Sequence, residues 1–290
     1  VDALLARAGY RAAYDIAGVE DDLREAFRRE PANLQVRLAA ADFYRREALE
    51  AQRRGTLGQA TERWEDACGE YQRVINDAAA EKERRSVAFL QEELAAYYGL
   101  ARSLVARGQH ERAAAVCREG LEVAPEQGLG LRFVLVESLG TLKQLDELER
   151  ELDLLADKLR QLAPMATQSP ELLAEHQSMS RSASLLRAKW HLAEGRSAEA
   201  IALLEDATLG PRGSAFEVAQ SIEAYRLLGQ ALAATGGWEE AAAAYENAAT
   251  LDTHAIGPML AAADAALRGG QFDKALAMAL RAQAADNAPA

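Results

Sequence analysis

Residues 222–255 read IEAYRLLGQALAATGGWEEAAAAYENAATLDTHA, and residues 256–289 follow with IGPMLAAADAALRGGQFDKALAMALRAQAADNAP. The two stretches share a glycine, an aromatic residue and an alanine at a spacing of 34 residues: Gly236 and Gly270, Trp238 and Phe272, Ala241 and Ala275. Self-similarity at a fixed period of this length is the signature of repeat architectures. The sequence therefore predicts stacked structural repeats.

Each residue type in the pattern has a physical task in a pair of antiparallel helices. Alanine allows two helix backbones to approach closely where they cross, and the bulky aromatic side chains fill the space between successive pairs. The glycine ends the first helix, because glycine adopts the left-handed conformation of a helix C-cap without strain. Acids such as Glu239 and Glu240 then suit the positive start of the second helix. A single pair cannot bury its apolar face alone, so the pairs must stack into a solenoid.

The full pattern resembles the tetratricopeptide repeat. In residues 222–255 the places of that repeat hold Tyr225, Leu228-Gly229, Leu232, Gly236, Trp238, Ala241, Tyr245 and Ala248. A third good unit spans 94–127, the unit from Leu129 has Leu142 at the place of the turn glycine, and a weaker unit starts at Arg181. The resemblance implies an all-α fold, a right-handed α-solenoid of stacked antiparallel helix pairs.

The departures from the pattern predict how the chain is organised. Helices near 33–53, 57–80 and 81–107 read longer than a usual repeat helix, and residues 1–18 do not fit a repeat. The stretch 163–170 contains Pro164 and Pro170, and proline interrupts helices. We expect an N-terminal half over 1–163, a hinge or loop over 164–170, and a C-terminal half over 171–290 with the regular repeats 222–255 and 256–289.

Composition and charge exclude several classes of function. The formal net charge is −12, and a nucleic-acid binder gains most of its affinity by neutralising phosphates with Lys and Arg. The same charge opposes an anionic membrane surface, and no apolar run reaches the length of a membrane span. We therefore expect neither nucleic-acid binding nor direct membrane insertion.

No catalytic, cofactor-binding or metal-binding constellation is found in the sequence. There is no phosphate-binding GxxxxGK loop, no HExxH and no GxSxG. The histidines are scattered and none has a cysteine or histidine partner at metal-ligand spacing: His110, His176, His191 and His254. The sequence thus predicts a protein that is not an enzyme and needs no cofactor.

One leucine row has the spacing of a coiled-coil seam. It consists of Leu145, Leu148, Leu152, Leu155, Leu159 and Leu162, which alternate by three and four residues. A long solenoid helix shows the same stripe where it packs against its neighbours. The row is therefore either intramolecular core or the seam of a homodimer.

The resemblance also implies a binding surface, because the first helices of tetratricopeptide pairs line the concave face where ligand peptides usually lie. The residues expected on that face here are Tyr98, Arg102, Phe133, Glu137, Lys189, Arg226 and Gln230. Aromatic and basic groups among them could hold an extended or helical segment that carries acids.

The function that follows is a non-enzymatic interaction scaffold that binds a partner protein or peptide. Because the chain opens at Val1, we expect it to be a piece of a longer protein or complex component. Two alternatives stay open: a peptide-sensing regulatory domain with its output domain elsewhere, and a substrate-recruiting accessory region of an enzyme. Frequent Ala and a preference for Arg over Lys suggest a bacterial source. The compartment would then be the cytoplasm or the periplasm.

Overall fold

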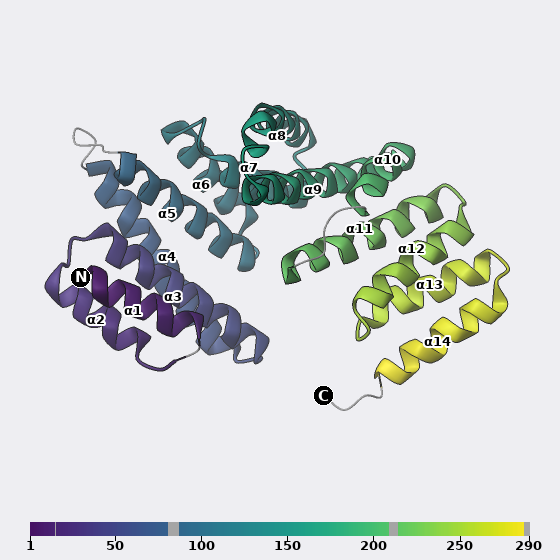
Figure 1. Cartoon of the computed structure of the whole chain (residues 1–290), viewed down its shortest axis with the longest axis horizontal. Helices are drawn as coiled ribbons and strands as arrows, with labels where there is room; N and C mark the ends of the chain where they lie inside the picture. Colours follow the sequence, from purple (N-terminus) through teal and green to yellow (C-terminus); the bar gives the residue numbers. More distant parts are fainter. Residues whose placement is uncertain (15, 81–86, 209–213, 287–290) are drawn as a thin grey trace. The chain divides into compact units, whose positions relative to one another are not determined.

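The computed structural model describes residues 1–14, 16–80, 87–208 and 214–286. All regular elements in these ranges are helices (Figure 1). Their bounds are α1 (Asp2–Ala13), α2 (Val19–Arg29), α3 (Leu34–Arg53), α4 (Leu57–Ala80), α5 (Val87–Ala106), α6 (His110–Val123), α7 (Leu129–Leu142), α8 (Leu145–Ala166), α9 (Pro170–Ala193), α10 (Ser197–Thr208), α11 (Ala215–Ala234), α12 (Trp238–Leu251), α13 (Ile256–Arg268) and α14 (Phe272–Asp286). The predicted all-α solenoid is confirmed, and residues 287–289 of the second regular repeat lie outside the described ranges.

Helices that follow each other in the chain pack against each other. The pairs α1–α2, α3–α4, α5–α6, α9–α10, α11–α12 and α13–α14 form hairpins, and contacts such as α4–α5 and α12–α13 stack one hairpin on the next. Odd-numbered helices also contact the next odd-numbered helix, as α3 does with α5, α5 with α7 and α9 with α11. Among the described residues, no successive even-numbered helices make a contact of similar extent. Within each unit, the odd-numbered helices therefore lie closer to one another than the even-numbered helices do.

The turns between paired helices follow the predicted glycine chemistry. Gly108, Gly195, Gly236 and Gly270 have φ between 71° and 87°, the left-handed region that glycine enters without strain. Where the sequence lacks this glycine, after α7, the left-handed position falls on Lys143 with φ 56°. The turn therefore keeps its left-handed backbone conformation, although this conformation is strained for a residue such as Lys143 that carries a side chain.

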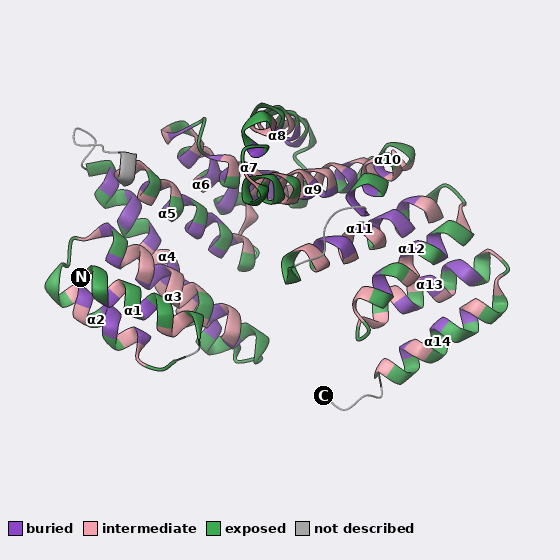
Figure 2. Cartoon of the chain, in the orientation of Figure 1, coloured by how far each residue is buried: buried purple, intermediate pink, exposed green. Residues whose placement is uncertain are grey.

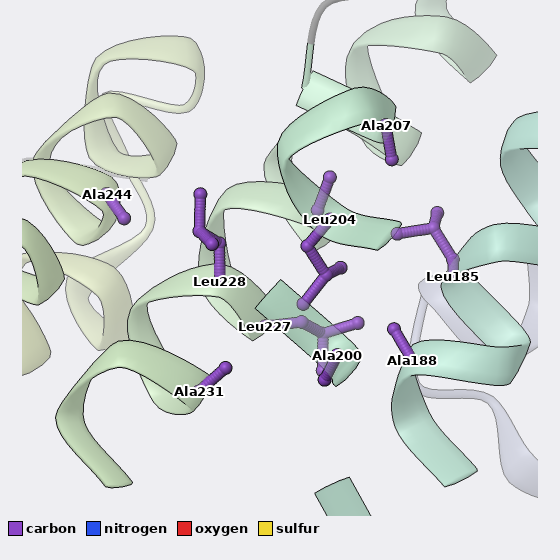
Figure 3. Close-up of a cluster of buried hydrophobic side chains, with 10 residues drawn as sticks. Leu185, Ala188, Ala200, Leu204, Ala207, Leu227, Leu228, Ala231 and Ala244 are labelled. Atoms are coloured by element: carbon purple, nitrogen blue, oxygen red, sulfur yellow. The ribbon is translucent and has the colours of Figure 1, made fainter. Parts of the chain in front are cut away.

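The interior is built largely from small side chains, because alanines make up much of the buried set. Figure 2 shows where the buried residues lie along the helices. Ala241 is fully buried and Ala275 nearly so, as expected for residues at helix crossings. Figure 3 shows one cluster in which α9, α10, α11 and α12 meet. Leu185, Leu204 and Leu227 fill its centre, and alanines surround them. Such packing loses contact energy with each methyl group removed.

The break predicted at 164–170 is shorter in the structure. Helix α8 continues through Pro164 to Ala166, and α9 already begins at Pro170, so only residues 167–169 lie outside helices. Pro170 occupies the first turn of α9, where its missing N–H removes no helical hydrogen bond. Ser169 caps that helix, because its Oγ accepts a hydrogen bond of 3.1 Å from the Leu172 N–H.

The chain divides into two compact units, residues 1–151 and 152–290. We call them the first unit and the second unit. Their boundary lies inside α8, about three turns before Pro164. The hinge proposed for 164–170 stays a prediction.

The leucine row is interior rather than surface for most of its length. Leu148, Leu152, Leu155 and Leu159 are buried in the chain, whereas Leu162 is half-buried and Leu145 is exposed. Of the two interpretations of this row, burial favours intramolecular core, because a buried leucine presents no surface to a second copy.

Candidate partner-binding face

The residues predicted for the binding face all lie on odd-numbered helices, but they fall in two separate units. Tyr98 and Arg102 are on α5 and Phe133 and Glu137 on α7, in the first unit; Lys189 is on α9 and Arg226 and Gln230 on α11, in the second. Phe133 and Glu137 are half-buried and the others are exposed. We call the exposed side of these helices the odd-helix face. It carries Asp42, Arg45, Tyr98, Arg102 and Glu137 in the first unit and Lys189, Glu223, Arg226 and Gln230 in the second.

In the first unit, α5 and α7 are joined by an ion pair on this face. The Arg102 Nη1 atom lies 2.8 Å from the Glu137 Oε2 atom, and both side chains are partly exposed. Beside this pair, the Tyr98 ring lies against Gly130 at the start of α7, where an added Cβ would come within 3.3 Å of the ring. Gly130 therefore allows an exposed aromatic ring to rest on the backbone of the neighbouring helix.

A polar cluster on the same face was not predicted from the sequence. Tyr71 belongs to α4, but its hydroxyl donates a hydrogen bond of 2.5 Å to Asp42 Oδ1 on α3. The Arg45 Nε–H donates to the same hydroxyl at 3.3 Å, and Arg45 Nε lies 3.6 Å from Asp42 Oδ1. The ring is fully buried, and Gly99 on α5 provides its space, because a Cβ at Gly99 would clash with the ring carbons.

This cluster holds Arg45 in a defined position and leaves its outer atoms available. Burial raises the pKa of Tyr71 far above its usual range, and the Asp42 carboxylate adds to the effect, so the hydroxyl stays a neutral donor. The Arg45 side chain is 33% exposed, and its Nη1 and Nη2 atoms make no hydrogen bond within the described residues. These two nitrogens form the planar fork that matches a carboxylate.

In the second unit the cations of the face are already paired. Lys189 Nζ lies 2.9 Å from Glu223 Oε1, and Arg226 Nε lies 2.7 Å from Glu223 Oε2. Burial alone would raise the pKa of Glu223, but hydrogen bonds from Arg226 and Lys189 outweigh it and lower that pKa to about 2. At neutral pH both cations therefore face an ionised partner.

Binding of an acidic segment stays a prediction, and among the arginines of the odd-helix face only Arg45 has two Nη atoms that are not already paired within the described residues. Arg102, Lys189 and Arg226 each form a close ion pair with a carboxylate of the chain itself, whereas Arg45 approaches Asp42 only through Nε, at 3.6 Å, and its two Nη atoms have no carboxylate partner among the described residues. Of the described residues, no group of three or more His, Cys, Asp or Glu side chains could hold a metal ion. None of the described helices is both long and apolar enough to cross a membrane.

Comparison with known proteins gives structural likeness alone. No family model and no curated protein matches the sequence. Among solved structures, BtubC from P. vanneervenii is 17% identical and covers 77% of this chain and 91% of its own, with a TM-score of 0.53. The TPR protein TTC0263 from Thermus thermophilus is 18% identical over 79% of this chain and 100% of its own, with a TM-score of 0.47. MamA from Desulfovibrio magneticus RS-1 is 17% identical over 67% of this chain and 94% of its own, with a TM-score of 0.48.

The 34-residue register, the glycine turns and the stacked hairpins agree with this likeness. The chain has a stacked helix-hairpin fold of the tetratricopeptide type. In a tetratricopeptide array the odd-numbered helices are the first helices of their pairs. That the odd-helix face of each unit is the concave, ligand-binding side of such an array stays a prediction.

Proposed function

We propose that this chain is a non-enzymatic interaction scaffold that binds a partner protein through the odd-helix face of its first unit. The observation that carries the proposal is the Arg45 fork, held from behind by Tyr71 and Asp42 and open toward solvent. An arginine that is already oriented loses little side-chain entropy when it binds. A surface arginine without such support would lose more.

The chemistry of the face indicates what the partner offers. Arg45 can receive a carboxylate in two parallel hydrogen bonds, and Tyr98, 44% exposed, presents an aromatic ring beside it on the neighbouring helix. Tyrosine and arginine are the residues that most often dominate interface energies. We infer that the partner segment carries an acidic residue together with an apolar side chain that packs on the Tyr98 ring.

The net charge of −12 has a consequence for this recognition. An acidic chain repels acidic partners at long range, so binding must depend on the local fork rather than on electrostatic steering. Added salt should therefore weaken the complex only modestly. The regulatory and accessory alternatives use the same face and differ only in what the partner segment is connected to.

The test is a comparison of two arginine variants on the same helix. Arg45→Gln removes the fork, whereas Arg53→Gln makes the same charge change at an exposed site in the last turn of α3. Each variant is used as bait in extracts of the source organism, and bound proteins are identified by mass spectrometry and titrated by calorimetry. Loss of one bidentate pair should weaken binding of the true partner at least about tenfold in Arg45→Gln and leave Arg53→Gln unchanged.

Thermal melts of both variants keep loss of binding separate from loss of folding. Tyr98→Ala serves as a second probe, because its ring packs on Gly130 from outside and is not part of the buried core. If folded Arg45→Gln and Tyr98→Ala proteins retain every partner at wild-type affinity, the odd-helix face of the first unit is not the binding site.

A further inference from the structure

The second unit contains a groove between α8 and α9 that its own side chains do not fill. The volume of the groove is about 290 Å³. Small-molecule sites in proteins begin at about 300 Å³, so this volume lies at the lower end of their range. The residues that line the groove come from α8, from α9 and, through Leu203, from α10, and all of them belong to the second unit.

Two contacts join α9 to α8 at the two ends of the groove. The Leu159 carbonyl oxygen accepts a hydrogen bond of 2.9 Å from His176 Nε2. About two turns earlier on α8, Asp153 Oδ1 lies 2.6 Å from Arg187 Nη2, which is farther along α9. The order of these contacts shows that the two helices run antiparallel here. The contacts therefore fix the separation of the helices over the stretch between them.

The side chains that face each other between these contacts are small. They are Ala156 on α8 and Ser180, Ala183 and Ser184 on α9. Where small residues allow two helices of this chain to touch, they are fully buried, as Ala242 is between α12 and α13. The four small residues of the groove are only half-buried, so α8 and α9 do not close on one another. The groove is the space that larger side chains would occupy.

The groove offers aliphatic surface together with hydrogen-bond donors that have no partner. Leu152, Leu159 and Leu203 contribute aliphatic side chains to its wall. The hydroxyls of Ser180 and Ser184 make no hydrogen bond within the described residues, although a serine in a helix can bond to the carbonyl oxygen one turn earlier. Both hydroxyls are therefore free to donate to a ligand.

The charged residues that line the groove are all basic. They are Arg160 and Arg187, and no acidic residue among the described ones lines it. The carboxylates that pair with these arginines, on Asp157 and Asp153, lie outside the lining. In a chain with a net charge of −12, such a lining favours an anion. Because each arginine already has one carboxylate partner, the excess of positive charge is small and suits a single negative charge better than a doubly charged phosphate.

We propose that this groove binds a small monocarboxylate with an apolar body. The body lies along the leucine and alanine side chains, and the carboxylate accepts hydrogen bonds from Arg187 and from the serine hydroxyls. Arg187 is the more enclosed of the two arginines, with 24% of its side chain exposed against 76% for Arg160. At roughly 30 Å³ for each water-sized group, the groove holds about ten non-hydrogen atoms. The proposal shares no residue with the odd-helix face and does not depend on it.

The first experiment titrates the full chain with three probes by calorimetry. Octanoate has an apolar body of matching size and one negative charge, 1-octanol has the same body without the charge, and acetate has the charge without the body. Octanoate should bind at one site with a dissociation constant below about 1 mM, and the other two probes should bind at least about tenfold more weakly. No saturable binding of octanoate at millimolar concentrations, or equal binding of 1-octanol, would overturn the proposal.

The second experiment changes the groove and keeps a matched control. Ala156→Leu fills the space from α8, and Arg187→Gln removes the charge, so each should weaken octanoate binding at least about tenfold. Arg118→Gln makes the same charge change and also breaks an ion pair between helices, with Glu147, but outside the groove. This control should bind octanoate like the wild type. Thermal melts establish that all three variants are folded, and wild-type affinity in folded Ala156→Leu would contradict the proposed site.

Methyl NMR of leucine-labelled protein locates the bound octanoate independently of any substitution. The methyl signals of Leu152, Leu159 and Leu203 should shift as octanoate is added, because these side chains line the groove. Signals of Leu104 and Leu135, buried in the first unit, should stay in place. Saturable binding that leaves the three groove leucines unshifted would place the ligand elsewhere and overturn the proposal.

Discussion

At the scale of single residues, the candidate site depends on a glycine that is needed for space rather than for its backbone conformation. Gly99 is helical, and its missing side chain leaves room for the Tyr71 ring that supports Arg45. Gly140 on α7 is also helical, but a Cβ there would meet nothing within 4 Å. Replacement of Gly140 by alanine therefore measures only the helix preference of alanine. Replacement of Gly99 by alanine adds the cost of a clash with Tyr71.

Replacement of each glycine by alanine should have opposite effects. Gly140→Ala should raise the free energy of unfolding by up to about 1 kcal/mol, because alanine favours the helix. Gly99→Ala should lower it by about 1–3 kcal/mol, since the added methyl group overpacks the core against Tyr71. Urea denaturation followed by circular dichroism measures both values. Equal stability of the two variants would show that Tyr71 can move aside without cost.

Tyr71 also shows where prediction from the sequence stops at this scale. The residues whose role is local, such as the turn glycines and the crossing alanines, could be placed from the repeat alone. Tyr71 shares an apolar row with Trp64 and Ile75 and therefore reads as core. Its hydrogen-bond partners Asp42 and Arg45 are 29 and 26 residues away, and only the packing of α3 against α4 brings them together.

At the scale of secondary-structure elements, the first hairpin is the clearest departure from expectation. Residues 1–18 fit no repeat in the sequence, yet α1 pairs with α2 and also contacts α3. The pairing depends on Asp22, which is buried and accepts hydrogen bonds from Arg7 and Arg11. Arg11 Nη1 also donates to the Gly18 carbonyl oxygen at 3.0 Å, so the same arginine closes the loop between the helices. Hydrogen bonds between side chains therefore join α1 to α2, although residues 1–18 lack the residue pattern of a repeat.

This network makes the stability of the hairpin depend on pH. The hydrogen bond from Arg7 lowers the pKa of Asp22 below its usual value, so the native state favours the ionised carboxyl. That contribution is complete above pH of about 4 and is lost as pH falls through the lower native pKa. Asp22→Asn should cost about 1–3 kcal/mol at neutral pH, because it replaces the buried carboxylate that pairs with Arg7 and Arg11 by a neutral amide. The difference in melting temperature between the wild type and Asp22→Asn should then shrink as pH falls below about 4.

The neighbouring Asp21 provides the control for this measurement. Its side chain is exposed and lies 3.7 Å from Arg24 within the same helix. An exposed pair of this kind contributes little, so Asp21→Asn should melt close to the wild type at every pH. If both variants behave alike, the effect belongs to the net charge of the chain and not to the buried contact.

At the scale of the whole molecule, the sequence repeat made the fold predictable, but it did not predict where the chain divides into two units. Within each unit the described hairpins contact mainly their neighbours, so a pattern that is clear in two repeats predicts the architecture of similar stretches. The limits of helices α3 and α4 followed from their apolar periodicity. The boundary between the units falls inside α8, and neither a proline nor a glycine marks it there. The position of this boundary depends on how many tertiary contacts the helices make on each side of it, and the sequence alone does not give those contacts.

Because repeat arrays are held by nearest-neighbour contacts, a local change should destabilise one unit more than the other. Trp64 reports on the first unit and Trp238 on the second, so two single-tryptophan proteins with the remaining tryptophans replaced by phenylalanine can follow the units separately. Asp22→Asn should lower the urea midpoint reported by Trp64 and leave that of Trp238 unchanged. Gly229→Ala, whose Cβ would come within 2.8 Å of the Tyr245 ring, should do the reverse. Equal shifts at both probes would mean that the 290 residues unfold as one cooperative body, with coupling along the array stronger than neighbour contacts alone provide.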